Sequence, residues 1–180
     1  MAQQYKLIFT GPVGAGKTTA IAALSDSEVI STDSKATDMT RERKETTTVA
    51  MDYGTLRLED GTHIHLYGTP GQERFDFMWE ILTEGGFGLM LLIDNTRQQP
   101  LQDLEFYVKS FREFIDATQL VVGVTRMDQS RVLELDDYNN KLLELNVRAP
   151  VFEVDARSKQ DVSVMLEALL HSLNVSTRNA

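Results

Sequence analysis

Cysteine is absent from this chain of 180 residues, and its absence excludes several kinds of chemistry. Without a thiol, the chain forms no disulfide, no thiolate metal site, and no prenyl or palmitoyl anchor. Ala2 follows the first Met, so the glycine that N-myristoylation requires is missing as well. We therefore expect a protein without a direct membrane anchor.

Long apolar runs and positive charge are also scarce. No hydrophobic stretch approaches the roughly 20 residues that a membrane-spanning helix needs. Lys and Arg number 18 against 27 Asp and Glu, and this net charge of −9 disfavours nucleic acid or an anionic membrane as the main partner. With 42% hydrophobic residues and neither a repeat nor a linker, residues 1–180 are expected to form one cytoplasmic domain.

The most informative segment is Gly11–Thr18, GPVGAGKT, which fills the pattern GxxxxGK[ST] between an apolar strand (5–10) and a helix (17–24). Glycines in such a loop let main-chain N–H groups approach phosphate oxygens, helped by the positive end of the helix dipole. Lys17 then reaches the β- and γ-phosphates, and the Thr18 hydroxyl ligates Mg²⁺. We predict a nucleotide site that includes Gly11, Val13, Gly14, Ala15, Gly16, Lys17, Thr18 and Thr19.

The remaining chain alternates apolar strands with helices, which predicts an α/β fold. Such alternation is typical of a doubly wound, mostly parallel sheet, here of six strands, with helices on both faces. The polar stretch 25–45 is expected to be a long functional loop. Strands are expected at residues 5–10, 48–59, 62–66, 87–94, 119–124 and 151–154, and helices at 17–24, up to 83, 101–115, 138–145 and 161–173.

Two of these strands are joined by Asp60-Gly61, a dipeptide that favours a hairpin, so they should be antiparallel. A two-residue turn would place His63 opposite Leu58 and His65 opposite Leu56. These imidazoles then pack on leucines, although a His-x-His metal site is an alternative.

Loops at the carboxyl ends of the strands carry further motifs, and ligands of open α/β sheets bind at those ends. Their order resembles the Ras-like small GTPase superfamily over nearly the whole chain. The prokaryotic small GTPases, including the polarity type with roadblock-domain regulators, are the most similar group, and the signal recognition particle receptor β subunit is a more distant likeness. The motifs are the phosphate loop, Thr46-Thr47-Thr48, Gly68-Thr69-Pro70-Gly71-Gln72, Thr125-Arg126-Met127-Asp128 and Asp155-Ala156-Arg157.

The resemblance implies a small G-domain of the P-loop NTPase class that binds GTP or GDP with Mg²⁺ and hydrolyses GTP slowly. Its stretch 25–45 would be the first switch, and Thr48 would ligate Mg²⁺ and sense the γ-phosphate, with Thr46 and Thr47 as alternatives. Gly71 would offer its N–H to that phosphate, and Gln72 would orient the attacking water.

The base-reading residues carry over with changes. Asp128 would accept hydrogen bonds from N1–H and the 2-amino group of guanine, which adenine cannot donate. The stem of Arg126 would lie on the base, whereas Thr125 replaces an Asn and offers fewer contacts. In the segment Asp155-Ala156-Arg157, the Ala156 N–H would meet the guanine O6 and Arg157 would pack on the other face of the base.

Four further features bear on catalysis and partners. Gly68 stands where the family has an Asp that holds Mg²⁺ through water, and Val13 stands where many members have Gly. Arg41 and Arg43 precede the switch threonines and could act as a built-in catalytic arginine, or they could be solvated loop residues. The apolar residues of 75–82 exceed what one helix face buries, so part of them is expected to contact a protein regulator or effector.

Two alternatives to the switch remain open at this point. A static GTP-binding scaffold of the same fold is favoured by Gly68 and the altered base loop, whereas Gln72 speaks against it. A metabolite kinase would need an arginine-bearing lid, for which the sequence shows no candidate.

Overall fold

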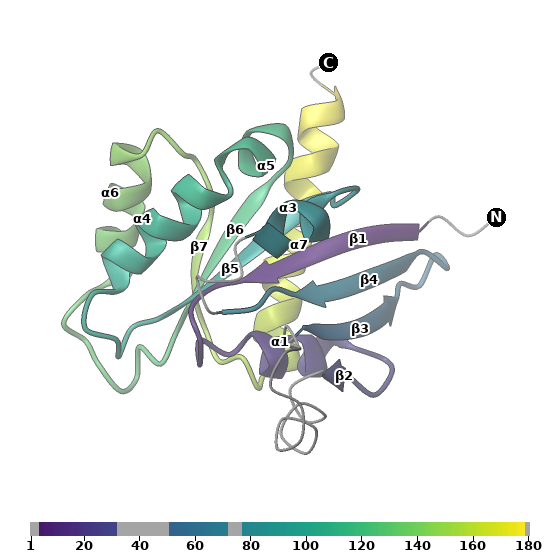
Figure 1. Cartoon of the computed structure of the whole chain (residues 1–180), viewed down its shortest axis with the longest axis horizontal. Coiled ribbons are helices and arrows are strands. Elements are labelled where there is room, and N and C mark those ends of the chain that lie inside the picture. Colours follow the sequence, from purple (N-terminus) through teal and green to yellow (C-terminus); the bar gives the residue numbers. More distant parts are fainter. Residues whose placement is uncertain (1–3, 32–50, 72–76, 179–180) are drawn as a thin grey trace, which may run out of the picture.

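The computed structural model describes residues 4–31, 51–71 and 77–178 (Figure 1). Within these ranges one sheet runs through the molecule and is covered by helices. The strands are β1 (Gln4–Thr10), β2 (Ile30–Ser31), β3 (Asp52–Arg57), β4 (His63–Gly68), β5 (Gly88–Asp94), β6 (Leu120–Thr125) and β7 (Val151–Val154). The helices are α1 (Lys17–Leu24), α3 (Phe77–Thr83), α4 (Pro100–Ser110), α5 (Arg112–Ala117), α6 (Leu135–Glu144) and α7 (Lys159–Arg178).

The strand order is β2-β3-β4-β1-β5-β6-β7, and only β3 runs against the others. The predicted mostly parallel α/β sheet with one antiparallel strand is therefore confirmed. The seventh strand, β2, lies in the stretch that was expected to be a loop. It holds only Ile30 and Ser31, which pair with Tyr53 and Asp52, so its apolar run is too short to be recognised in the sequence.

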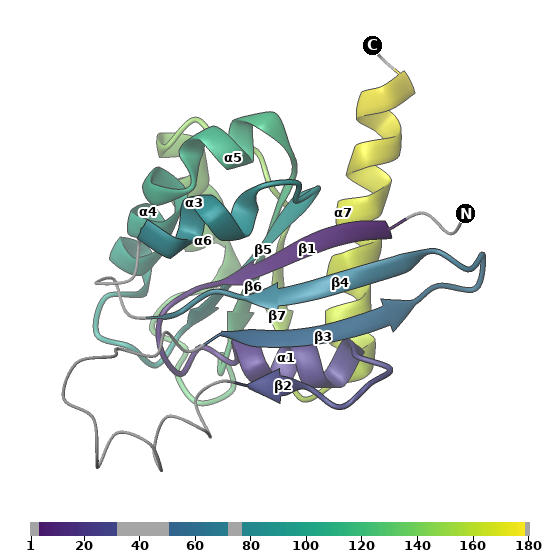
Figure 2. The ribbon, with the colours of Figure 1, turned by 45° about the vertical axis from the view of Figure 1, so that its right-hand side comes forward.

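Helices cover both faces of the sheet, and a hydrophobic core fills each side. On one face α1 and α7 lie together, and on the other α3, α4, α5 and α6 (Figure 2). All seven residues of β5 are buried, as expected for a central strand. Its side chains alternate between the cores because strand residues point to opposite faces: Met90 and Leu92 join α1 and α7, while Leu89, Leu91 and Ile93 join the other core.

The β3–β4 hairpin is antiparallel as predicted, but its predicted register is wrong by one residue. The Leu58 N–H donates to the Thr62 carbonyl at 2.9 Å, which leaves a three-residue loop instead of two. Gly61 adopts φ 85° there, the left-handed conformation that such loops require. His63 consequently pairs with Arg57 and His65 with Thr55, not with leucines.

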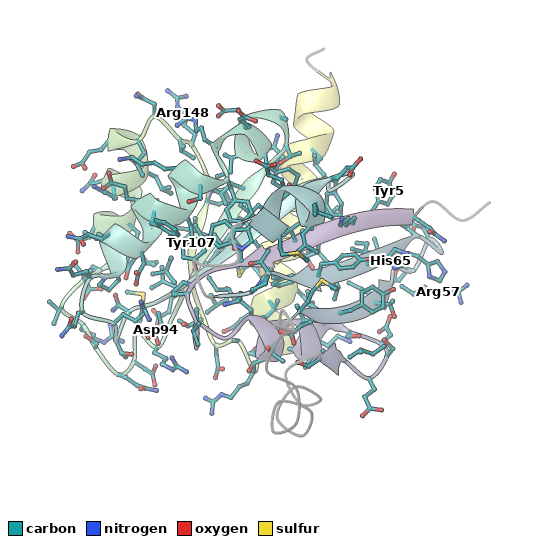
Figure 3. The ribbon with its side chains drawn as sticks, viewed as in Figure 1. Tyr5, Arg57, His65, Asp94, Tyr107 and Arg148 are labelled. Atoms are coloured by element: carbon teal, nitrogen blue, oxygen red, sulfur yellow. The ribbon has the colours of Figure 1, made fainter. Side chains whose placement is uncertain are left out.

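The Nδ1 atom of His65, which is labelled in Figure 3, accepts or donates a hydrogen bond with the Tyr53 hydroxyl, 2.7 Å away. Among the described residues, no cluster of three or more His, Asp or Glu side chains could hold a metal ion.

The expected helix 101–115 is interrupted. Phe111 has φ −102° and ψ 16°, which separates α4 from α5. Its ring is buried and stacks on Trp79 of α3, with ring centroids 4.9 Å apart. Trp79 and Leu82 of α3 are core residues, whereas Ile81 is 62% exposed.

Candidate nucleotide site

The loop between β1 and α1 has the backbone of a phosphate-binding loop. Gly11, Gly14 and Gly16 have φ values of 141°, 81° and 103°. A Cβ on Gly11 would lie 2.1 Å from the Leu92 carbonyl oxygen, so only glycine fits there. The path of this loop leads the chain directly into α1 at Lys17, as predicted.

Lys17 folds back over its own loop and is 8% exposed. Its Nζ donates to the carbonyl oxygens of Gly11 at 2.7 Å and Pro12 at 2.8 Å. Burial lowers the pKa of Lys17 to about 8, the Asp52 carboxylate opposes this, and the positive charge of Arg97 adds to it. An anion placed on this loop would supply the missing countercharge and favour the charged lysine.

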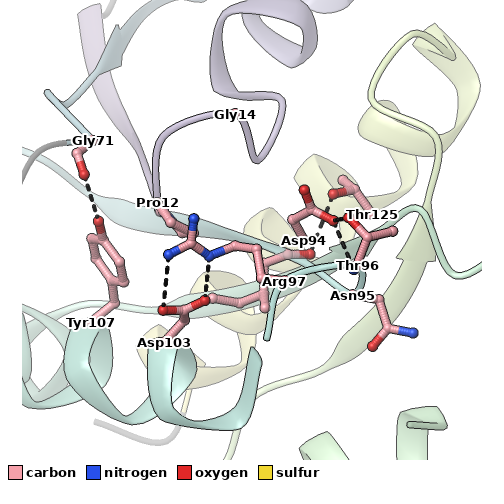
Figure 4. Close-up of polar contacts among 12 residues, drawn as sticks. Pro12, Gly14, Gly71, Asp94, Asn95, Thr96, Arg97, Asp103, Tyr107 and Thr125 are labelled. Atoms are coloured by element: carbon pink, nitrogen blue, oxygen red, sulfur yellow. Dashed lines mark hydrogen bonds and ion pairs between the residues drawn. The ribbon is translucent and has the colours of Figure 1, made fainter. Parts of the chain in front are cut away.

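The segment that follows β4 lies against the phosphate loop. A Cβ on Gly71 would be 2.7 Å from the Val13 nitrogen and 2.9 Å from the Lys17 Nζ, so the close approach depends on glycine. The Tyr107 hydroxyl of α4 donates to the Gly71 carbonyl at 3.2 Å (Figure 4). Gly71 is thus held beside the loop residues that were predicted to contact the γ-phosphate.

An ion pair lies at the start of α4. The Arg97 Nε donates to the Asp103 carboxylate at 2.6 Å, and Figure 4 shows this pair on the same side of the loop as the Tyr107–Gly71 hydrogen bond. The positive charge of Arg97 is close enough to Lys17 to lower the pKa of that lysine. Arg97 is therefore an arginine beside the phosphate loop that the sequence did not predict.

A pocket of approximately 670 Å³ adjoins the phosphate loop at the ends of β6 and β7. Ala15, Gly16 and Thr19 line one side. The predicted base-reading residues Thr125, Arg126, Asp128, Asp155, Ala156 and Arg157 also line it, together with neighbours of theirs and Asp161. The tertiary structure therefore brings residues from three separate loops to one cavity, as the sequence predicted.

Arg126 links this pocket to the phosphate loop. It adopts φ 58°, and its Nη1 donates to the Gly14 carbonyl at 2.9 Å and to the carboxylate of buried Asp94. Asp94 also accepts hydrogen bonds from the Thr96 N–H and hydroxyl (Figure 4). The guanidinium is thus fixed on the protein, which leaves the aliphatic stem to lie against a ligand.

Thr125 is 4% exposed, and its hydroxyl lies 3.1 Å from the Ala15 carbonyl oxygen and 3.3 Å from that of Ile93. A hydroxyl has one proton, which is committed here to main-chain carbonyls. Thr125 therefore connects β6 to the phosphate loop through a hydrogen bond, and it also lines the pocket.

Asp128 is exposed in the pocket, and its charge is close enough to raise the pKa of Arg157 slightly after the larger effect of Asp155. Arg157 pairs with Asp155 through Nε at 2.9 Å and Nη2 at 2.8 Å. These hydrogen bonds lower the pKa of Asp155 to about 2. The Ala156 main chain is held between them, at the end of β7.

Several predicted residues lie outside the described ranges: Arg41, Arg43, Thr46, Thr47, Thr48 and Gln72. Their roles stay predictions. Thr18, the other predicted ligand of Mg²⁺, is described, and its hydroxyl donates a hydrogen bond to the Asp52 carboxylate.

A known protein family matches most of the chain. The family model described as "Conserved hypothetical ATP binding protein" matches residues 27–179. The chain belongs to this family. The matched range begins after the phosphate loop, so that loop, described above, is a separate observation in favour of nucleotide binding.

Curated relatives of this member of the ATP-binding family include Ras-related proteins. It is 25% identical to Ras-related protein Rab-13 of Rattus norvegicus over 96% of the chain and 81% of that protein. It is 24% identical to Ras-related protein Rab-27B of Bos taurus over 92% of the chain and 77% of the relative. A third match, "Uncharacterized protein MJ1339" of Methanocaldococcus jannaschii, is 40% identical over 32% of the chain and only 37% of that protein's length.

These relatives and the loop geometry identify a nucleotide-binding P-loop protein related to the Ras-like proteins. No described helix is long and apolar enough to cross a membrane.

Sequence reasoning missed three charged residues of the site: Asp52, Asp94 and Arg97. Asp94 had a signal, because a carboxylate directly ends the apolar run of β5. Asp52 had a weaker one: it precedes Gly54 and Leu56 on the buried face of β3. Arg97 had none, since only folding brings it to the phosphate loop.

Proposed function

We propose that this protein is a GTP/GDP switch that hydrolyses GTP slowly and signals to protein partners. The observation that supports this most is the position of Asp128 in the pocket beside the phosphate loop, which Arg126 and Arg157 also line. A carboxylate accepts two hydrogen bonds side by side, which matches the N1–H and 2-amino donors of guanine. In this proposal, residues 1–180 form one domain that acts in the cytoplasm.

The family to which the chain belongs is described as ATP-binding, so the preference between adenine and guanine nucleotides must be measured first. Adenine has an acceptor at N1 and no 2-amino group, and Asp128 would face it unpaired. A site built to hydrogen-bond such donors rejects a ligand that lacks them by roughly 10⁴-fold. We expect this margin of GTP over ATP.

Isothermal titration of GTP, GDP, ATP and XTP tests the proposal. Asp128→Asn should lower GTP affinity and raise XTP affinity, because the new amide donates to the C2 oxygen of xanthine. Asp136→Asn is the matched control, since Asp136 is exposed on α6 and lies outside the pocket. Equal affinity of the unmutated protein for ATP and GTP would refute guanine selection and favour the ATP reading.

Catalysis is proposed to depend on positioning and charge, as phosphoryl transfer generally does. Lys17 would neutralise the phosphates and Gly71 would donate its N–H to the γ-phosphate, with Thr18 and Thr48 as ligands of Mg²⁺. Gln72 would orient the water. We expect intrinsic hydrolysis at about 10⁻⁴–10⁻² s⁻¹, the range spanned by GTPases without and with an internal arginine.

Single-turnover assays separate the catalytic candidates. Gln72→Ala should abolish stimulated hydrolysis, and Arg41→Ala or Arg43→Ala should slow it if either arginine acts on the γ-phosphate. Arg97→Ala belongs in the same series, because its charge lies near the loop. Rapid turnover by the unmutated protein alone would contradict the slow switch.

The partner surface is proposed to include α3, because Ile81 is 62% exposed while its neighbours Trp79 and Leu82 are buried. This surface would bind an effector and a regulator, and the regulator could be of the roadblock type or of another type. Ile81→Asp should weaken binding of a partner without altering nucleotide affinity. Loss of nucleotide affinity in this variant would instead indicate a structural role.

A further inference from the structure

Gly68 ends β4 beside the phosphate loop and has no side chain to offer a metal ion. The antiparallel register places Asp52, the first residue of β3, directly opposite it. A Cβ built on Gly68 would lie 3.2 Å from the Asp52 Cβ and 3.3 Å from its Oδ2. The Asp52 carboxylate thus lies in the space that a side chain of Gly68 would enter.

This carboxylate is buried and belongs to the phosphate-binding end of the sheet. Asp52 is 9% exposed, and its Oδ2 accepts the hydrogen bond of the Thr18 hydroxyl. A buried charge at this place is costly unless a cation or hydrogen bonds compensate it.

The two side chains form a donor set of one hydroxyl and one carboxylate, both oxygen ligands. Mg²⁺ prefers oxygen, keeps several waters, and is held in nucleotide sites by one or two such groups together with phosphates. The residues present therefore fit this ion.

We propose that Asp52 supplies, from β3, the carboxylate that binds Mg²⁺ directly or through its water, in place of the side chain that Gly68 lacks. This rests on the proposed function, in that the nucleotide is bound with Mg²⁺. In this arrangement the carboxylate comes from β3 instead of β4, and it lies beside Thr18. The protein would then bind Mg²⁺ although position 68 has no acidic side chain.

The test measures metal affinity instead of turnover. Nucleotide affinity is measured in EDTA, and Mg²⁺ is then titrated into the nucleotide complex while the dissociation rate of a fluorescent GDP is followed. Mn²⁺ binding, followed by electron paramagnetic resonance, gives a second readout. If the nucleotide panel shows ATP binding, fluorescent ADP replaces GDP and the logic is unchanged.

Asp52→Asn keeps the size and an oxygen that accepts from Thr18, but removes the charge. It should weaken Mg²⁺ binding about 10- to 100-fold, as loss of a supporting carboxylate does, with nucleotide affinity in EDTA unchanged. Glu59→Gln is the matched control, because it removes one exposed charge at the far end of the same hairpin. This control should leave Mg²⁺ affinity as it is.

The exchange variant Asp52→Gly with Gly68→Asp returns the carboxylate to β4 and should recover most of the Mg²⁺ affinity lost in Asp52→Gly alone. Asp52→Asn with Mg²⁺ affinity within twofold of the unmutated protein would overturn the proposal and leave Asp52 as a holder of Thr18. Equal loss of nucleotide affinity with and without metal would overturn it in the same way. Failure of the unmutated protein to bind any nucleotide would refute the proposed function itself.

Discussion

Lys17 should make the nucleotide-free protein less stable than a variant that lacks its charge. Its pKa falls from 10.5 to about 8, chiefly through burial. Each unit of such a shift corresponds to about 1.4 kcal/mol, so the charged form costs the native state roughly 3 kcal/mol. Lys17→Met removes this cost but leaves the Gly11 and Pro12 carbonyls without their donor, for about 1–3 kcal/mol.

The net expectation is a gain of up to about 2 kcal/mol in the free energy of unfolding at pH 7, with loss of nucleotide binding. For a chain of this length, a gain of about 2 kcal/mol corresponds to a rise in melting temperature of about 4–8 °C. The assay is urea unfolding of both proteins after removal of nucleotide. Lys159→Met, at an exposed lysine of α7, is the control and should not stabilise.

The dependence on pH identifies the cause. Below pH 8 Lys17 is charged in the native and the unfolded state, and the full penalty is present. Between pH 8 and 10.5 the native state has released the proton while the unfolded state still binds it, so stability of the unmutated protein rises with pH. The advantage of Lys17→Met must shrink over this range. A stability difference between the two proteins that does not change over this pH range would refute the reasoning.

Three further outcomes follow from the geometry. Gly71→Ala puts a Cβ 2.7 Å from the Val13 nitrogen and should lower the affinity for a GTP analogue more than that for GDP, by calorimetry; equal loss would contradict a γ-phosphate contact. Arg157→Ala should raise the pKa of Asp155 from about 2 toward 3.8 in a carbon-13 NMR titration, whereas an unchanged value would mean that the pair does not form in solution. Asn146→Val should cost about 1–2 kcal/mol in urea unfolding, because Asn146 has φ 54°, while Asn146→Gly should cost nothing.

The sequence by itself determined the features that depend on local chemistry. The pattern Gly11–Thr18 requires positive φ at its glycines, and the structure has them at Gly11, Gly14 and Gly16. Continuous apolar runs predicted buried parallel strands, and β5 and β6 are buried throughout. The residues that line the pocket beside the phosphate loop were predicted from the resemblance to the Ras-like family, and they lie together because parallel strands end at one edge of the sheet.

Tertiary structure decided what depends on pairing and packing between distant segments. The hairpin register depends on Asp60, which does not adopt the positive φ that a two-residue type I′ turn needs at both of its residues, and the dipeptide pattern alone does not show this. The break at Phe111 lies where its ring stacks on Trp79, far away in the sequence, and the apolar spacing of 101–115 does not reveal this contact. Above all, Gly68 read alone is a lost metal ligand. Only the strand pairing places the Asp52 carboxylate opposite it and beside Thr18, because cross-strand neighbours are a property of the register and not of either strand.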